Sequence, residues 1–238
     1  MKKLFLSLLL AAGFCNLLAQ KTINDPNAEK RSVGSFHGID VSTGIKLIIT
    51  EGDTEEVAVS ASKTEYRDKI VTKVENGILK IRYESQLGAI NTKKESKNLK
   101  AYVSYKTLDK LSATTGAEVE VNGVLKSSSL DLVSNTGGTI KGEIDITTLD
   151  VDQNTGSRVT LTGKADNLEV DGDTGSKFLG EQLKTTNCNA SVSTGAQVII
   201  TVEKELSAKA NTGGYIKYKG GGVIRDVKIN TGGSVSKI

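Results

Sequence analysis

The residues of this chain with the clearest chemical potential are carboxylates that recur at fixed intervals. Acidic side chains stand 19 residues apart in two series, Asp131, Asp150 and Glu169, then Asp152 and Asp171, with Asp173 close behind. If equivalent residues stack, each series forms an outward column with its carboxylates about 4.8 Å apart. Like charges at that spacing favour a cation such as Ca²⁺, a nearby base or plain solvation. Asp152, Asp171 and Asp173 are therefore candidates for a metal site, with solvation as the simpler interpretation.

A few other side chains invite a chemical role. His37 is the only histidine, and no Ser, Cys or carboxylate stands at a spacing typical of general-base catalysis, so we expect a surface or cap residue. Cys188 occupies a repeat position that holds Leu in other copies, which predicts a small buried residue. Tyr215 and Lys217 are candidates for contact with a sugar or a protein, whereas alternation turns Tyr218 inward. The sequence predicts no catalytic residue and no cofactor.

These residues belong to an internal repeat. The dipeptide Thr-Gly recurs at steps of 18 to 21 residues, beginning at Thr115, Thr136, Thr155, Thr174, Thr194, Thr212 and Thr231. An apolar residue stands four positions before and four positions after each Thr, as Val151 and Val159 do around Thr155. Polar residues alternate with the apolar ones. This period of two predicts strands rather than helices.

A copy of about 19 residues cannot bury its apolar face alone, so the copies must stack. The sequence therefore predicts an all-β fold, a right-handed parallel β-helix (solenoid) with about 19-residue coils and an irregular β-rich N-terminal cap. Each coil is expected to hold two or three short strands. The motifs of leucine-rich repeats, of hexapeptide helices and of calcium-binding nonapeptides are absent from the sequence.

The turn at each Thr-Gly pair has its own pattern. Asn or Asp precedes the Thr in most copies, as at Asn135, Asn154 and Asp173, and a small residue follows the Gly. Asn and Asp side chains bond to nearby backbone, and Gly accepts a positive φ. We therefore expect a tight corner in which the Gly lies beneath the neighbouring coil and Asn or Thr side chains form a ladder.

The part before the repeat is less regular but still β-patterned. Strand-like segments flank Asn76-Gly77, which is a strong hairpin signal, and residues 84–100 resemble a loop. Thr43-Gly44 repeats the corner once. The predicted organisation is a signal peptide at 1–19, an extension at 20–35, irregular β coils or a cap at 36–110, and regular coils at 111–238, with the last two forming one continuous domain.

The first residues indicate export. Two Lys precede an apolar run from Leu4 to Phe14, and a cleavage site is expected after Ala19. A lipoprotein anchored through Cys15 is the alternative, but the residue before it should be small and is Phe14. No later stretch is apolar enough to span a membrane. Periplasm, outer-membrane surface and extracellular space are the expected locations.

The charge balance bears on the class of binding partner, and the cysteine count bears on disulfide bonds. Without residues 1–19 the chain carries 29 basic and 28 acidic residues, so nucleic acid is not an expected partner. Only Cys188 remains after cleavage, which excludes an intrachain disulfide.

The export signal, the segment from Phe36 to Ile45, the Asn76-Gly77 hairpin and the Thr-Gly coils together resemble the head GIN domain family, also called putative auto-transporter adhesins. The resemblance covers roughly residues 33 to 235. It implies a right-handed β-helical fold and an envelope or extracellular location, and it carries over no catalytic or binding residue.

Taken together, these features predict an exported, non-catalytic, adhesin-like module that presents a ladder surface to a glycan or an envelope protein. A polysaccharide lyase or hydrolase on the same scaffold is the alternative of a different class. A purely structural envelope spacer is the third possibility.

Overall fold

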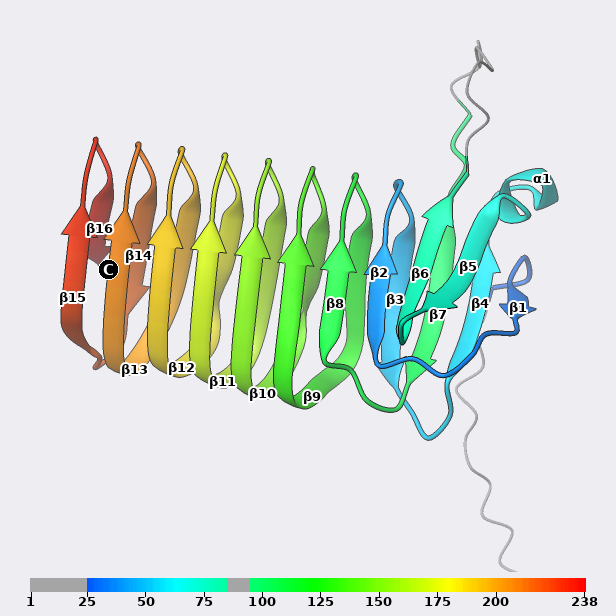
Figure 1. The fold of residues 1–238 in the computed structure, drawn as a ribbon, viewed down its shortest axis with the longest axis horizontal. Coiled ribbons are helices and arrows are strands. Elements are labelled where there is room, and N and C mark those ends of the chain that lie inside the picture. Colours follow the sequence, from blue (N-terminus) through cyan, green and yellow to red (C-terminus); the bar gives the residue numbers. More distant parts are fainter. Residues whose placement is uncertain (1–24, 85–94) are drawn as a thin grey trace, which may run out of the picture.

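Each Thr-Gly repeat forms one coil of a β-solenoid (Figure 1). The computed structural model describes residues 25–84 and 95–238. The repeat region consists of β8 (Lys110–Ala113), β9 (Glu118–Ser134), β10 (Thr139–Gln153), β11 (Arg158–Gly172), β12 (Lys177–Val192), β13 (Gln197–Ala210), β14 (Tyr215–Lys219), β15 (Val223–Ile229) and β16 (Ser234–Lys237). All of these pair in parallel with their counterparts in a neighbouring coil.

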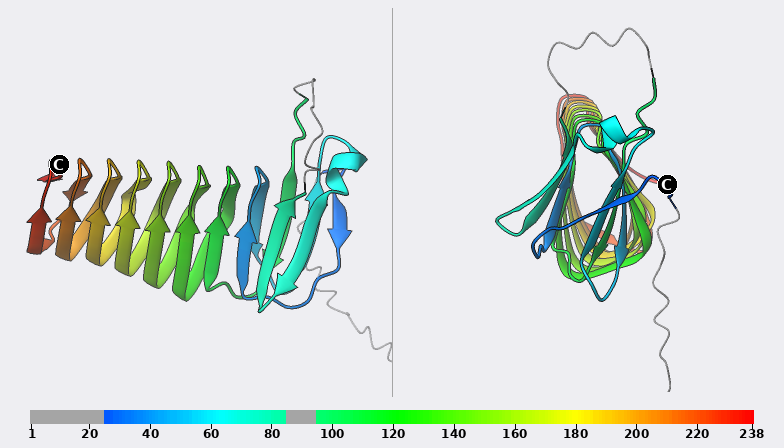
Figure 2. Two further views of the ribbon diagram at one scale, coloured as in Figure 1. Left: turned by 45° about the horizontal axis from the view of Figure 1, so that its top comes forward. Right: turned by 90° about the vertical axis from the view of Figure 1, so that its right-hand side faces the viewer.

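The long strands each pass around the base of the rod. A strand leaves one corner, bends at the base and rises on the other face to the next corner (Figures 1 and 2). In Figure 1 the front segments run upward while the chain advances from right to left, which is the sense of a right-handed helix. The right-handed β-helix is thus confirmed, but one bent strand of 14 to 17 residues replaces the two or three short strands expected in most coils.

Bulges at the base absorb the uneven repeat length. β10 and β11 pair residue for residue, from Thr139↔Arg158 to Gln153↔Gly172. Between β9 and β10 the register shifts at Lys141/Glu143, and β12 carries shifts on both of its sides. Inserted residues are accommodated there as local kinks. The corners consequently stay stacked although the steps between them differ.

The interior is filled by the apolar residues that flank each corner. Val151 and Val159 are fully buried, and so are their counterparts in neighbouring coils, such as Val170 and Phe178. The outward residues between them are polar. This alternation is the packing that the period of two predicted.

The corner has two consecutive residues with positive φ. Thr136 has a φ of 48° and Gly137 one of 73°, and the other corners repeat these values closely. The Gly138 N–H donates to the Asn135 carbonyl oxygen at 3.0 Å, which closes a tight turn of the type I′ kind. The expectation of a positive φ at Gly is confirmed. The positive φ at Thr was not predicted, because a β-branched residue rarely adopts it.

Hydrogen bonds hold Thr in this strained backbone. The Gly137 N–H donates to the Thr155 carbonyl oxygen of the next coil at 3.0 Å, and this bond repeats from Gly44 to Gly213. Within a coil, the Asn135 side-chain oxygen accepts the Thr136 N–H at 2.7 Å. Most of the described corner Asn and Asp side chains thus cap their own turn, while Asn230 donates to Asn211 across coils at 2.9 Å.

The packing at the corner differs from the expectation in one respect. Nothing lies within 4 Å of a Cβ built on Gly137, so this Gly does not lie beneath a neighbouring coil. The small residue after it does: a Cβ on Gly138 would overlap the Ala113 carbonyl. Ser157 and Ser176 are buried at the same position.

The N-terminal part begins with a coil of its own. It contains β1 (Glu29–Arg31), β2 (Gly38–Val41), β3 (Lys46–Glu51), β4 (Glu56–Ser60), α1 (Thr64–Arg67), β5 (Ile70–Glu75), β6 (Ile78–Tyr83) and β7 (Lys100–Tyr105). The β2–β3 corner at Thr43-Gly44 stacks on the Thr115 corner. The later strands β6 and β7 lie on its outer side, so the order along the rod departs from the order in the sequence.

Antiparallel strands then close this end. β5 and β6 form the hairpin predicted at Asn76-Gly77, and β4 pairs antiparallel with β7 and β1. The expected signal peptide and residues 85–94 of the expected loop lie outside the described residues. In the part of the chain that is described, no helix is long and apolar enough to span a bilayer.

Candidate ligand-binding face

Stacking gathers the predicted carboxylates on one face of the rod. We call this the polar face, and it consists of outward side chains on the strand halves that rise to the corners: Thr148, Asp150, Asp152, Asn167, Glu169, Asp171, Asn187, Asn189, Ser191, Glu205 and Ser207. All of them are exposed or half-buried. Equivalent residues pair directly, as Asp150 does with Glu169. The columns expected from the sequence are therefore present.

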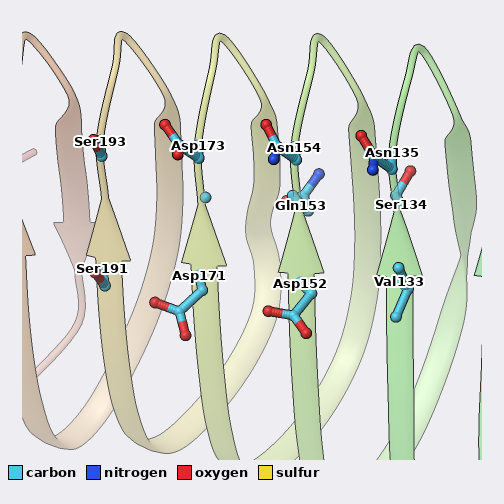
Figure 3. Close-up of a pocket in the computed structure, with 11 residues that line it drawn as sticks. Val133, Ser134, Asn135, Asp152, Gln153, Asn154, Asp171, Asp173, Ser191 and Ser193 are labelled. Atoms are coloured by element: carbon cyan, nitrogen blue, oxygen red, sulfur yellow. The ribbon is translucent and has the colours of Figure 1, made fainter.

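Asp152 and Asp171 are direct neighbours on this face. They pair across β10 and β11, and their carboxylates project to the same side (Figure 3). Together with Ser191, Asn154 and Asp173 they line a shallow depression of about 420 Å³. In the described chain, no three His, Cys, Asp or Glu side chains are grouped closely enough to hold a metal ion.

Asp173 has a different role from the other two candidates. Its carboxylate accepts the Thr174 N–H at 2.7 Å and so closes the corner of its own coil. The hydroxyl of Thr194 and the Thr174 N–H lower the pKa of Asp173. Because its oxygens are engaged in these bonds, Asp173 serves the fold in the same way as Asn135 and Asn154.

A second depression of about 310 Å³ lies on the polar face farther from the corners. Asn167, Asn187 and Asn189 line it with Asp150 and Glu169. The Asn187 side-chain amide donates to the Asn167 oxygen at 3.0 Å, which makes a short amide ladder between coils. The two depressions thus present carboxylate, amide and hydroxyl groups in rows.

The carboxylates on this face interact unfavourably with one another. Partial burial, followed by the charges of Asp152, Glu169, Asp131 and Asp171, raises the pKa of Asp150 above its usual 3.8. An Asp with a raised pKa binds its proton more tightly in the folded protein than in the unfolded chain. The free energy of unfolding therefore falls as the pH rises from about 3.8 through the raised pKa.

We accordingly expect Asp150→Asn to stabilise the protein at pH 7. Removing one of several like charges should raise the free energy of unfolding by about 0.5 kcal/mol. The gain should vanish below pH 3.8, where Asp150 is already neutral. Urea unfolding at several pH values measures this difference.

Asp145→Asn on the same strand is the matched control, because Asp145 pairs with Lys164 at 3.1 Å and should gain nothing from neutralisation. Equal effects of the two substitutions at pH 7 would show that repulsion on the polar face is negligible.

The aromatic candidates lie elsewhere. Tyr215 and Lys217 are on β14, which follows a corner and lies on the face opposite to the polar face. Lys217 Nζ lies 5.8 Å from the centre of the Tyr215 ring. Tyr218 is buried, as alternation predicted. The structure therefore does not combine Tyr215 and Lys217 with Asp152 and Asp171 in one site.

His37 has a partner that sequence spacing did not reveal. Its Nδ1 lies 2.7 Å from the Asp109 carboxylate, and both side chains are largely exposed. The two residues are 72 positions apart and meet because β2 pairs with β8.

Cys188 is buried between Leu168 and Leu206 of the neighbouring coils, as expected, and burial raises its pKa to about 12. A thiol with that pKa is unreactive at neutral pH.

Asn167, Asn187 and Ser207 were not identified from the sequence as part of the face. Their spacing could have revealed them, because Ser207 continues the column of Asp150 and Glu169, and Asn167 and Asn187 form the column two residues before it. A neutral polar residue at a repeat position does not by itself indicate a site, whereas recurring carboxylates do.

Comparisons with known proteins agree with this architecture. The family model described as "Putative auto-transporter adhesin, head GIN domain" matches residues 35–222. A solved structure of a putative adhesin from Bacteroides fragilis has a TM-score of 0.75 at 18% identity, covering 89% of this chain and 96% of that one. A putative lipid binding protein from Parabacteroides distasonis has a TM-score of 0.69 at 17% identity, covering 90% and 98%.

A putative adhesin from Parabacteroides merdae has a TM-score of 0.65 at 15% identity, covering 89% of this chain and 95% of that one. At these identities the structures show a shared fold. No curated protein matches the chain. The family model covers most of the chain, so the protein belongs to the head GIN domain family.

Proposed function

We propose that this protein is an exported, non-catalytic binding module whose polar face binds a glycan. The observation that carries the proposal is the pair of shallow depressions on that face, lined mainly by rows of acidic, Asn and Ser side chains, with Val133 in the larger one. Such groups match the hydroxyls of a sugar as donors and acceptors. The repeat places equivalent groups about 4.8 Å apart along the rod, so an extended chain can contact several coils.

A glycan fits this face better than a protein or an acyl chain. Protein interfaces have an apolar core with aromatic anchors, and the polar face has neither. The exposed large hydrophobic side chains among the described residues all lie in the last coil, from Val223 to Ile238. A lipid tail would need an apolar groove, whereas Asp152, Asp171 and Ser191 line the larger depression.

Binding rather than turnover is favoured by the openness of the site. Catalysis by a carboxylate pair requires a cleft that excludes water and orients the substrate. Asp152 and Asp171 are exposed on a nearly flat sheet, and Asp173 is engaged in its corner. Export is supported by the predicted signal peptide at residues 1–19 and by membership in the head GIN domain family.

A glycan array probed with the purified protein tests the proposal. We expect binding to one or more extended glycans and a loss of at least about tenfold in affinity for the double variant Asp152→Ala/Asp171→Ala, because two acceptors are removed from the depression. The double variant Arg158→Ala/Lys177→Ala changes two exposed residues on the opposite face and should bind normally. Absence of glycan binding, or equal losses in both variants, would contradict the assignment.

A further inference from the structure

The end of the rod formed by the last coil is apolar and uncovered. Each large hydrophobic side chain that is exposed in the described ranges lies there: Val223, Ile224, Val227, Ile229 and Ile238. In Figure 1 this coil stands at the left end, and no described segment covers it. The rest of the described surface has no comparable patch.

Three of these side chains belong to the interior columns of the solenoid, whereas Val223 continues the outward column of Glu205. Ile224, Val227 and Ile229 pair in register with Leu206, Ala208 and Ala210, which are all buried. Their exposed fractions are 41%, 37% and 49% because no further coil packs on them. The patch is therefore a cross-section of the core.

The same end has unpaired strand edges. β15 pairs with β13 alone and β16 with β14 alone, so each leaves one edge without a described partner. The last corner keeps the standard conformation, with a φ of 45° at Thr231 and 74° at Gly232. An open, regular edge beside apolar side chains is a strong template for further strand pairing.

The opposite end of the rod has different edges. There β1 is a three-residue edge strand of Glu29, Lys30 and Arg31, paired antiparallel with β4, and β5 is the second edge, paired antiparallel with β6 and carrying Lys73 and Glu75. Short, charged edge strands resist further pairing. Head-to-tail stacking of two copies is consequently disfavoured, and within this chain the surface that matches the uncovered end is the same end of a second copy.

A two-fold axis perpendicular to the rod would bring two such ends together. This symmetry sets the edge strands of the two copies antiparallel, which is a normal ladder geometry. The cross-section of a coil is about 500 Å² on each copy. The two sheets lie about 10 Å apart, their side chains widen the section further, and the strands are about seven residues long. The total of about 1,000 Å² meets the minimum for a specific interface.

Most of the charges next to the patch are already paired within the chain, and Lys237 on β16 is the one Lys or Arg of the last coil without an ion pair to a described residue. Arg225 pairs with Glu205 at 2.8 Å and Lys228 with Asp226 at 3.3 Å, both within one chain. Charges that are already paired add little repulsion between two copies.

We infer that the protein forms a two-fold symmetric dimer through its last coil, with β15 and β16 at the interface. The dimer covers the apolar end and doubles the length of the rod. It also presents two polar faces on one particle, so weak contacts with a repetitive ligand gain avidity. The dimer itself does not depend on the identity of that ligand.

Sedimentation velocity of the purified protein over a range of micromolar concentrations tests the inference. We expect a particle with twice the mass of one chain, and a monomer for Ile224→Lys, which places a charge in the apolar end. Thr147→Lys, at an exposed position in the middle of the rod, is the matched control and should remain dimeric.

Amide exchange provides a readout that needs no variant. We expect the amides of β15 and β16 to exchange more slowly at high protein concentration than after dilution, while those of β10 stay unchanged. A monomer at every concentration, a mass that grows without limit through head-to-tail stacking, or a dimer that survives Ile224→Lys would overturn the inference. Binding of another molecule to a monomeric end would overturn it as well.

Discussion

Replacing Gly163 by Ala is expected to lower the free energy of unfolding by about 3 kcal/mol, because two costs coincide at this position. Gly163 has a φ of 98°, which L residues rarely adopt. A Cβ there would also overlap the Ile144 carbonyl oxygen of the preceding coil. Since that carbonyl belongs to the ladder between β10 and β11, it cannot move without disturbing the stack.

Gly156→Ala, seven residues earlier in the same coil, is the matched control. Gly156 has a φ of 68°, but nothing lies within 4 Å of its built Cβ. Only the conformational cost of about 1 kcal/mol should apply. Thermal unfolding followed by circular dichroism should show Gly163→Ala about 10 °C below the parent and Gly156→Ala only a few degrees below it. Similar melting temperatures for both variants would show that contact between coils at the base is looser than described.

The two glycines illustrate what the sequence can predict. The regular Thr-Gly spacing identified the coils, their corners and the positive φ of Gly156, because each of these depends on a local pattern. The importance of Gly163 depends on the carbonyl of a residue 19 positions away, and no spacing reveals that overlap. The positive φ at Thr155 was missed for a related reason, since hydrogen bonds from its surroundings override its own preference.

The N-terminal part was the least predictable. Its strands and the Asn76-Gly77 hairpin were visible as local signals. The order of the coils was not visible. The coil of β2 and β3 lies between the coil of β8 and β9 and the later strands β6 and β7, and no local signal shows that later strands pack on its outer side. The pair of His37 and Asp109 depends on this arrangement and was missed with it.

The candidate site was predictable in part. The 19-residue spacing placed Asp152 and Asp171 side by side on one face. It did not distinguish them from Asp173, whose bonds to its own corner are visible only in the turn geometry. Alternation identified Tyr215 and Lys217 as outward residues, but it did not indicate that they lie on the other face.

Interchangeable coils stacked in register are the central claim, because the polar face, the core and the uncovered end all depend on them. β10 and β11 pair without a bulge, so deleting residues 139–157 should let β11 take the place of β10 against β9. The new junction keeps the corner at Asn135 and joins Gly138 to Arg158, the residue that pairs with Thr139. Stability in a repeat protein is close to a sum over neighbouring coils, so the loss of one coil should be modest.

Deleting residues 139–148 removes fewer residues but should be far more damaging. The remaining part of β10 would then reach the next corner without passing around the base, and its inward side chains would lose their register with both neighbours. The later coils would lack a partner on one side.

Thermal unfolding by circular dichroism, with limited proteolysis of the same samples, compares the two deletions directly. The chain lacking 139–157 is expected to keep the β-sheet spectrum and a single cooperative transition within about 10 °C of the parent, whereas the chain lacking 139–148 is expected to lose cooperative unfolding and become protease-sensitive. Equal damage from both deletions, or better tolerance of the shorter one, would contradict the stacked solenoid.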